Sequence, residues 1–315
     1  MPVCTSCTHP SPYLYTVYGA PNNIRLEKCT ACHEFVDPYV EHDSLTILLD
    51  LLLLKRGVYR HLIFNQGAEP RKVSGKTTDK VEVDEASKAS AERDRWILLC
   101  QLGLTLVAVD AFIRWSYLKP STTAIGEPWS KDDAMTLLRF FIGTAAETIA
   151  FHGGISLSCF IVMHLLGLFN PNHSTFREEF RLSMISMSLF YSSLTKFFLL
   201  LLLTIWTPGS SAKPRIVHTL PSWVNNLWTG DSDLVIRIFQ FLDDDKLDRE
   251  WIIRNVLGGM TAGFGLRVIL DLHPALTSLI ILIGWLAKKT MAKFVCEWVG
   301  GSAGASEAWL AYSIP

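Results

Sequence analysis

The sequence lacks a strong net charge. It has 29 Lys and Arg residues against 30 Asp and Glu residues, which leaves a formal net charge of −1. Proteins that bind nucleic acid through electrostatic attraction carry a basic patch or a basic recognition helix. No segment of this chain resembles either one. We therefore expect no nucleic-acid partner.

Residues 1–43 contain no charged region followed by an apolar stretch, so we expect no secretory signal peptide. Membrane insertion is then expected to begin with an internal helix. Apolar residues make up 49% of the chain, and its mean hydropathy is +0.25. They concentrate after Arg95, in runs too long and too poor in charge for the helices of a soluble core. The sequence therefore predicts a multi-pass α-helical membrane protein.

Cysteine is scarce beyond residue 32. Cys100, Cys159 and Cys296 lie singly in apolar sequence, and we expect them to act as small buried hydrophobic residues.

The other four cysteines form two pairs, Cys4-x2-Cys7 and Cys29-x2-Cys32, with twenty-one residues between the pairs. Two such turns can bring four thiolates to the corners of a tetrahedron, which suits zinc. Binding of a structural zinc ion is worth on the order of 10–16 kcal/mol, enough to hold a small domain that has almost no core. The pattern predicts a closed structural Cys4 zinc ribbon.

The cysteine pattern allows three other interpretations. Disulfides would require an oxidising compartment, and a thioredoxin-like redox site would require a βαβ context that is absent from the sequence pattern. A neighbouring histidine, His9 or His33, could also replace one cysteine as a ligand.

Five regions follow from the changes in composition along the chain. Residues 1–43 form the β-rich ribbon, and residues 44–65 form a short amphipathic, interfacial helix that cannot span a bilayer core of roughly 30 Å. Residues 66–95 are a charged linker without aromatic residues, which we expect to be disordered. Residues 96–299 are the membrane region, and residues 300–315 are a C-terminal tail.

Within the membrane region, three long apolar runs predict spans at about 96–117, 141–169 and 182–206. Residues 252–270 and 272–287 predict either two further spans or a re-entrant hairpin broken at His273-Pro274. The expected number of spans is therefore four or five.

The distribution of basic residues predicts the orientation. Ten Lys or Arg residues lie between Lys55 and Arg95, whereas the next loop, before Phe141, contains three. Since short cytosolic segments carry the excess of basic residues, the N-terminal domain is expected to face the cytosol, where thiols stay reduced.

A polar cluster surrounds the short helix, and two interpretations of it stay open. Its members could be caps and salt bridges that fasten the ribbon to the helix. Alternatively, basic and aromatic side chains could form a surface for lipid headgroups or a protein partner. The candidates for that surface are Lys55, Arg56, Tyr59, Arg60 and His61.

Ionisable residues inside the predicted spans are candidate functional sites, because a central charge normally faces protein or a wet cavity. The candidates are Glu147, His152 and Lys196. We predict a Lys196–Glu147 pair between helices, while Asp110 and Arg114 could neutralise one another. His164 is expected to be a core histidine.

A small-residue face in the fourth apolar run has a separate role. Gly259 and Gly263 form a GxxxG pattern, for which internal helix packing is favoured over dimerisation.

The stretch from Cys4 to Asn65 resembles the N-terminal homology domain of the Arv family, eukaryotic proteins of sterol and lipid homeostasis. The residues that carry the resemblance are Cys4, Cys7, Leu14-Tyr15, Tyr18, Ile24-Arg25-Leu26, Cys29, Cys32, Asp37, Tyr39, Glu41, Asp43, Asp50-Leu51, Lys55, Tyr59-Arg60-His61 and Phe64-Asn65. The rest of the chain is similar only in kind, as several spans after a variable linker.

The resemblance implies residence in the endoplasmic reticulum, with the Golgi as a second compartment. It also implies a role in sterol distribution, with effects on sphingolipid metabolism and on glycosylphosphatidylinositol precursors. We expect this role to be non-enzymatic, because no residue spacing in the chain matches a catalytic motif. Partners would be these lipids and other lipid-metabolism membrane proteins. Two alternatives are kept: a membrane-bound acyl or glycolipid transferase that uses His164 or His152 as base, and an adaptor that recruits lipid-handling enzymes through the ribbon.

Overall fold

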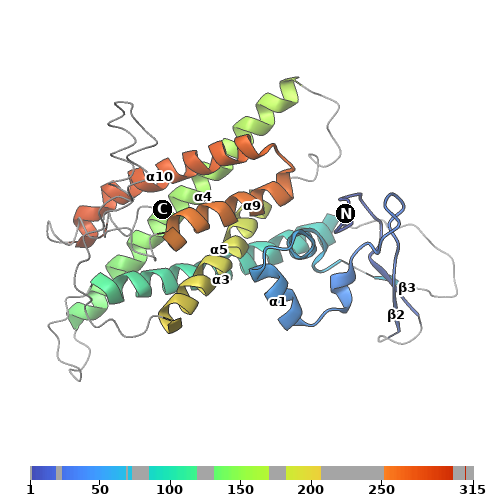
Figure 1. Ribbon diagram of the computed structural model, residues 1–315, viewed down its shortest axis with the longest axis horizontal. Coiled ribbons are helices and arrows are strands. Elements are labelled where there is room, and N and C mark those ends of the chain that lie inside the picture. Colours follow the sequence, from blue (N-terminus) through green and yellow to red (C-terminus); the bar gives the residue numbers. More distant parts are fainter. Residues whose placement is uncertain are drawn as a thin grey trace, which may run out of the picture.

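The structure is a computed structural model that describes residues 2–18, 23–68, 70–72, 85–118, 131–169, 182–206, 252–300 and 309. It is mostly helical, and the cysteine-containing domain lies at one end of a bundle of long helices (Figure 1). Three of the described helices are long and apolar enough to cross a membrane.

The N-terminal domain contains a small sheet. Strands β1 (Tyr15–Val17) and β2 (Ile24–Leu26) pair antiparallel, which fits the β-rich segment predicted for residues 1–43. A third strand, β3 (Arg71–Lys72), pairs in parallel with the other edge of β1. The prediction that residues 66–95 are disordered is wrong for Arg71 and Lys72, which form this strand. Backbone pairing with an available strand edge orders a segment that has no apolar side chains of its own.

The segment after the sheet contains two helices rather than one. A 3-10 turn, η1 (Pro38–Glu41), leads into α1 (Ser44–Leu52), and α2 (Arg56–Arg60) continues directly into a π-helical turn, η2 (His61–Asn65). The break occurs at Leu54, whose φ of 57° places it in the left-handed region. The predicted single helix of residues 44–65 is therefore wrong in detail, because a residue in that conformation ends a right-handed helix.

The first long helix starts earlier than predicted. Helix α3 runs from Glu85 to Leu118, so the prediction of a disordered linker is wrong for residues 85–95. This stretch is rich in Ala, Glu, Lys and Arg, all good helix formers. Adding such residues to an existing helix costs far less than nucleating a new one, so the charged segment extends the apolar helix.

The second and third long helices are α4 (Lys131–Phe169) and α5 (Leu182–Trp206). Helix α5 has the predicted bounds, and α4 begins ten residues before the predicted span at residue 141. The candidate spans within α3, α4 and α5 are Glu92–Ser116, Asp133–Leu165 and Ser183–Leu203.

The last two predicted segments are separate helices. A π-helical turn, η3 (Ile252–Leu257), leads into α9 (Gly258–Leu270), and α10 (Pro274–Gly300) follows after a break. The break begins at Asp271, which has a φ of 45°, and it includes the predicted breaker His273-Pro274. Among the described helices, α9 is apolar but too short to count as a span, and α10 extends thirteen residues beyond the predicted end at residue 287. The number of spans, four or five, stays a prediction.

Packing within the bundle joins helices that are distant in sequence. Helix α10 packs along α4, α9 packs along α5, and α3 packs against α4 (Figure 1). The two glycines of the GxxxG pattern face α10, since Cβ atoms added at Gly259 and Gly263 would lie 4.0 Å from Ile281 and Thr277. The prediction that this face serves internal packing is confirmed.

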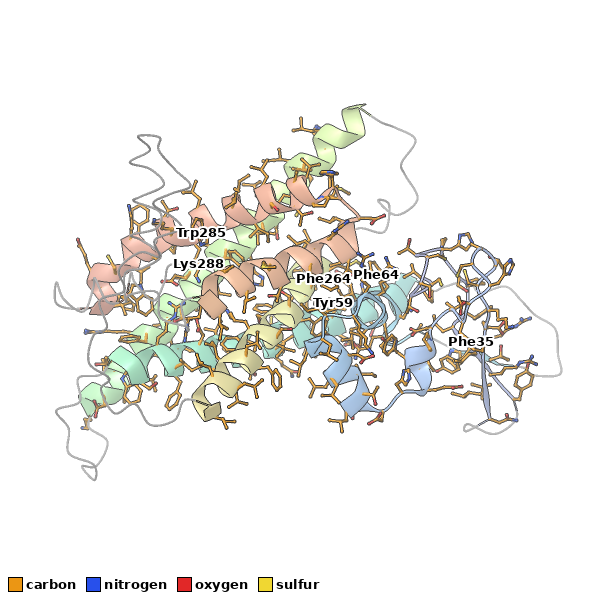
Figure 2. The ribbon with its side chains drawn as sticks, viewed as in Figure 1. Phe35, Tyr59, Phe64, Phe264, Trp285 and Lys288 are labelled. Carbon is orange, nitrogen blue, oxygen red and sulfur yellow. The ribbon has the colours of Figure 1, made fainter. Side chains whose placement is uncertain are left out.

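The N-terminal domain packs directly against the bundle. The rings of Tyr59 in α2 and Phe264 in α9 meet edge to face with centroids 5.6 Å apart, and Figure 2 shows these two side chains at the junction. Tyr59 is fully buried. An aromatic contact of this type contributes about 0.5–1.5 kcal/mol in addition to the free energy of burying its surface. The contact therefore helps to fix the position of the domain on the bundle.

Asn65, the last residue of η2, ties this junction to the start of the chain. Its side chain accepts from the Val3 N–H at 2.8 Å and donates to the Val3 carbonyl at 2.9 Å and to Asp37 Oδ2 at 2.7 Å. All three residues are buried. Removal of the amide therefore leaves buried polar groups without partners, which costs about 1–3 kcal/mol for each group.

We expect Asn65→Ala to destabilise the N-terminal domain by about 2–4 kcal/mol, since several of these groups lose their partner at once. Amide hydrogen exchange should then speed up across β1, α2 and η2. Asn23→Ala is the matched control, because the Asn23 side chain is exposed. Equal exchange rates in the two variants would contradict the prediction.

Candidate functional site

The four predicted cysteine ligands lie on two turns with the same backbone hydrogen bonds. In the first turn, the Thr8 N–H donates to the Cys4 carbonyl at 2.9 Å; in the second, the His33 N–H donates to the Cys29 carbonyl at 3.0 Å. Thr8 and His33 both have a φ of 63°. The second cysteine of each pair is thus followed by a left-handed residue, which turns the chain back and directs both thiols of the pair to the same point.

The two turns face each other and gather the sulfur atoms. Cys4 Sγ lies 3.7 Å from Cys32 Sγ, and Cys7 Sγ lies 3.5 Å from Cys29 Sγ. All four ligand atoms lie within 4.8 Å of one another. A tetrahedron with metal–sulfur bonds of about 2.3 Å has sulfur atoms separated by about 3.8 Å. The four thiols therefore fit one metal ion.

The surroundings also favour thiolates. Desolvation raises the pKa of the Cys29 thiol, but the backbone N–H groups of Cys32 and Ala31 and the neighbouring thiols outweigh this effect and lower the pKa to about 7. Among the described residues, the four cysteines are the group whose potential ligand atoms lie close enough together to hold a metal ion. Neither His9 nor His33 belongs to that group, and both are exposed.

The predicted headgroup surface is only partly exposed. Lys55 and Arg56 lie at the surface, but Tyr59 is fully buried and Arg60 is 9% exposed. The prediction of an exposed headgroup surface is therefore wrong for Tyr59 and Arg60, because Tyr59 packs between the domain and the bundle.

Arg60 and His61 instead connect the helices α2 and η2 to the cysteine-containing segment through hydrogen bonds. The Arg60 guanidinium donates to the carbonyls of Thr5 and Ser6, both at 2.8 Å, inside the first cysteine turn. His61 Nδ1 lies 2.7 Å from Asp37 Oδ2. The interpretation that the polar cluster holds the ribbon to the helices is confirmed for these residues.

A second group of predicted residues lies inside the bundle, where the ion pairs differ from those expected. Glu147 is fully buried and accepts from Arg114 at 2.8 Å. Arg114 also lies 2.9 Å from Asp110, which in turn accepts from Arg254 at 2.8 Å. The predicted Lys196–Glu147 pair is wrong, because the Glu147 carboxylate pairs with Arg114 of α3 instead. The predicted Asp110–Arg114 pair is confirmed.

Sequence reasoning missed two members of this group. Arg254 is not among the predicted sites, yet its ion pair with Asp110 joins η3 to α3. Trp309 had been placed in the tail; its ring centroid lies 5.0 Å from the Arg114 guanidinium carbon, and its side chain is fully buried. No sequence spacing predicts either contact, because their partners are over a hundred residues away.

Lys196 and His152 lie together, as candidate residues should, at a cavity of about 270 Å³ between the helices. The His152 ring lies 4.3 Å from the ring of Phe190, and Lys196 Nζ lies 4.7 Å from the ring of Phe197. His164 is exposed and stacks on Phe160, so the prediction of a core histidine is wrong.

Comparison with known proteins identifies the family. The model of the Arv1-like family matches residues 3–228, which is more than half of the chain. The chain belongs to the Arv1-like family. The match includes the four cysteines, the helical junction and the first three long helices.

Curated members of the Arv1-like family are similar to the N-terminal domain. Protein ARV1 of Saccharomyces cerevisiae is 51% identical over 63 residues, which cover 20% of this chain and 19% of that protein. Protein ARV 2 of Arabidopsis thaliana is 45% identical over 62 residues, covering 20% and 27%, and Protein ARV1 of Mus musculus is 34% identical over 62 residues, covering 20% and 23%. The matched stretch thus spans about a quarter or less of each relative, and no solved structure matches the chain.

The Arv1-like cysteine site can be tested through its stoichiometry. We expect one metal ion per purified chain, and Cys29→Ser should remove it because a tetrahedral site with three thiolates binds far more weakly. Metal content by elemental analysis, together with the absorption of a cobalt-substituted sample, provides the measurement. Cys100→Ser is the control, since Cys100 is an exposed free thiol outside the site. Full metal content in Cys29→Ser would contradict the assignment.

The buried ion network allows a separate prediction. Arg114→Met should destabilise the bundle by about 3–5 kcal/mol, because two carboxylates then lose a buried partner. Thermal unfolding in lipid nanodiscs measures the effect. Arg139→Met on α4 is the control, because Arg139 is exposed. Equal unfolding temperatures for the two variants would show that Arg114 is not required.

Proposed function

We propose that this protein mediates the distribution of sterol and other lipids in the membrane of the endoplasmic reticulum, with the Golgi as a second compartment and the N-terminal domain in the cytosol. Effects on sphingolipid metabolism and on glycosylphosphatidylinositol precursors are part of the same proposal. The observation that carries it is family membership over residues 3–228, which combines the cysteine domain with long apolar helices.

One structural feature supports contact between the N-terminal domain and lipid. Helix α1 has a row of exposed leucines at the spacing of a single helix face: Leu45, Leu48, Leu49 and Leu53, which are between 46% and 69% exposed. The helix packs against α5, where Thr195 Oγ1 donates to the Leu52 carbonyl at 3.3 Å. Because Thr195 lies within a candidate span, the leucine face would meet the apolar layer of the membrane.

Zinc is the metal that we propose for the cysteine site. Four thiolates in a closed tetrahedral arrangement are typical of structural zinc, and no position is left open for substrate. The ion would hold the two cysteine turns together, and the first of these turns supplies the carbonyls of Thr5 and Ser6 that accept from Arg60. The metal would thus stabilise the seat of the domain on the bundle and would take no part in chemistry.

An enzymatic alternative depends on His152, because this histidine lines the cavity with Ser192 and Ser193. The hydroxyls of these serines donate to the carbonyls of Leu189 and Phe190 on their own helix, both at 2.8 Å. An activated nucleophile would instead be hydrogen-bonded to its base. We therefore propose a non-enzymatic protein; turnover of a labelled acyl or glycolipid donor, lost in His152→Ala, would contradict this.

The proposal is tested by complementation. Expression of this chain in Saccharomyces cerevisiae lacking its Protein ARV1 should restore the normal share of sterol in the plasma membrane, measured by fractionation and sterol extraction. Cys29→Ser should fail to restore it, whereas Cys100→Ser should succeed. The first 65 residues expressed alone should also fail; full rescue by them would favour an adaptor over a lipid mediator.

A further inference from the structure

The cavity between the helices carries an excess of positive charge. Four cationic side chains line it: Arg114, Lys196, Arg254 and Lys288. Against them stand two carboxylates, Asp110 in the cavity wall and Glu147 behind Arg114. Within the part of the chain that the structure describes, this group therefore has two more cations than anions, with His152 counted as neutral.

Both carboxylates form ion pairs with the arginines. Asp110 bonds to both Arg114 and Arg254, and Glu147 bonds to Arg114. Among the described residues, Lys196 and Lys288 take part in no ion pair. The two lysines are thus the excess cations, and they lie within electrostatic range of each other and of both arginines.

Such an excess is expensive between membrane helices. A single central Lys or Arg costs roughly 2.5–3.5 kcal/mol on insertion scales, and cations in low dielectric also repel each other. Helices normally carry such charges only where they face a wet cavity or an anion. A negatively charged ligand in this cavity would therefore offset the electrostatic cost of the two lysines.

The charge and the position of the cavity favour a lipid with an anionic headgroup over a sterol. A sterol is apolar apart from one hydroxyl group, so it would leave both lysines uncompensated. Leu282 lines the cavity and is also 55% exposed on the outside of α10, so the cavity wall reaches the surface that would face lipid. Figure 2 shows Trp285 and Lys288 on the side of α10 that faces the other helices. Basic pockets between membrane helices are typical sites for phospholipid headgroups.

We propose that this cavity binds a phosphate ester group, with Lys196 and Lys288 as its two donors and Arg254 beside them. The group would belong to an anionic membrane lipid whose chains stay in the bilayer next to Leu282. A free phosphate has the same recognition chemistry and is distinguished below. The inference deepens the proposed role in lipid distribution, and it names an anionic phospholipid, not a sterol, as the ligand of this site.

Binding to the purified full-length protein in detergent tests the site. The probes are dioctanoyl phosphatidic acid, phosphatidylinositol and phosphatidylcholine, with inorganic phosphate as a separate arm, and the readout is the dissociation constant from calorimetry. The anionic lipids should bind more tightly than phosphatidylcholine, because only they bring net negative charge. Tighter binding of the lipids than of inorganic phosphate assigns the site to a headgroup; equal binding assigns it to the free ion.

Three variants locate the ligand. Lys196→Met and Lys288→Met should each weaken binding of the anionic lipids by about ten-fold or more, since each removes one charge-assisted hydrogen bond. Lys289→Met is the matched control, because this neighbour on α10 is exposed and does not line the cavity. Lys288→Arg should keep most of the affinity. Folding should be retained in the methionine variants, because they relieve repulsion between cations.

Two results would overturn the inference: equal affinity of the Lys196→Met, Lys288→Met and Lys289→Met proteins, or binding of phosphatidylcholine as tight as that of the anionic lipids. Neither result bears on the sterol complementation described above. Restored sterol distribution with unchanged lipid binding in the lysine variants would leave the proposed function standing and remove this site alone.

Discussion

The ion pairs of Arg114 are the interaction on which the helical bundle depends. Through its guanidinium group, Arg114 in α3 binds Glu147 in α4, while Asp110 extends the network to Arg254 in η3. Each of these charges would be costly alone in an apolar environment, and each is tolerable when paired. The requirement for mutual pairing therefore fixes which helices can be neighbours and at what height they meet.

The same network shapes the cavity. Because both carboxylates already pair with arginines, the lysines of α5 and α10 face the cavity without an anionic partner among the residues that the structure describes. The ion network and the proposed binding site thus lie in the same cavity. Arg114 and Arg254 form the ion pairs between the helices, whereas Lys196 and Lys288 line the cavity where a ligand would bind. The volume of about 270 Å³ is modest, which suits a headgroup better than a whole lipid.

At the other end of the molecule, a small polar core couples the cysteine domain to the bundle. Asp37 accepts hydrogen bonds from Asn65 and from the Tyr39 N–H, and it lies beside His61. Arg60 reaches into the first cysteine turn. A metal that orders these turns would therefore also stabilise the contact between α2 and α9. Loss of the metal should then destabilise the packing of α2 against the helical bundle.

Much of this architecture could be predicted from local sequence. The two cysteine pairs, the start of α5, the break at His273-Pro274 and the pairing of Asp110 with Arg114 all depend on spacing along the chain, so short-range patterns were sufficient. The early start of α3 was missed because composition alone does not show that an adjacent apolar helix will propagate into a charged segment. The burial of Tyr59 and Arg60 was missed because it depends on a helix two hundred residues away.

The amino-acid sequence by itself determined the two cysteine pairs, the family and the long apolar helices, since residue type and local spacing are enough to specify four candidate metal ligands and helices of membrane-spanning length. Only the tertiary structure decided that Glu147 pairs with Arg114, that Arg254 joins them, and that Lys196 and Lys288 share a cavity. The reason is physical: a buried charge takes the partner that helix packing brings nearest, and no periodicity within one helix encodes which neighbour that will be.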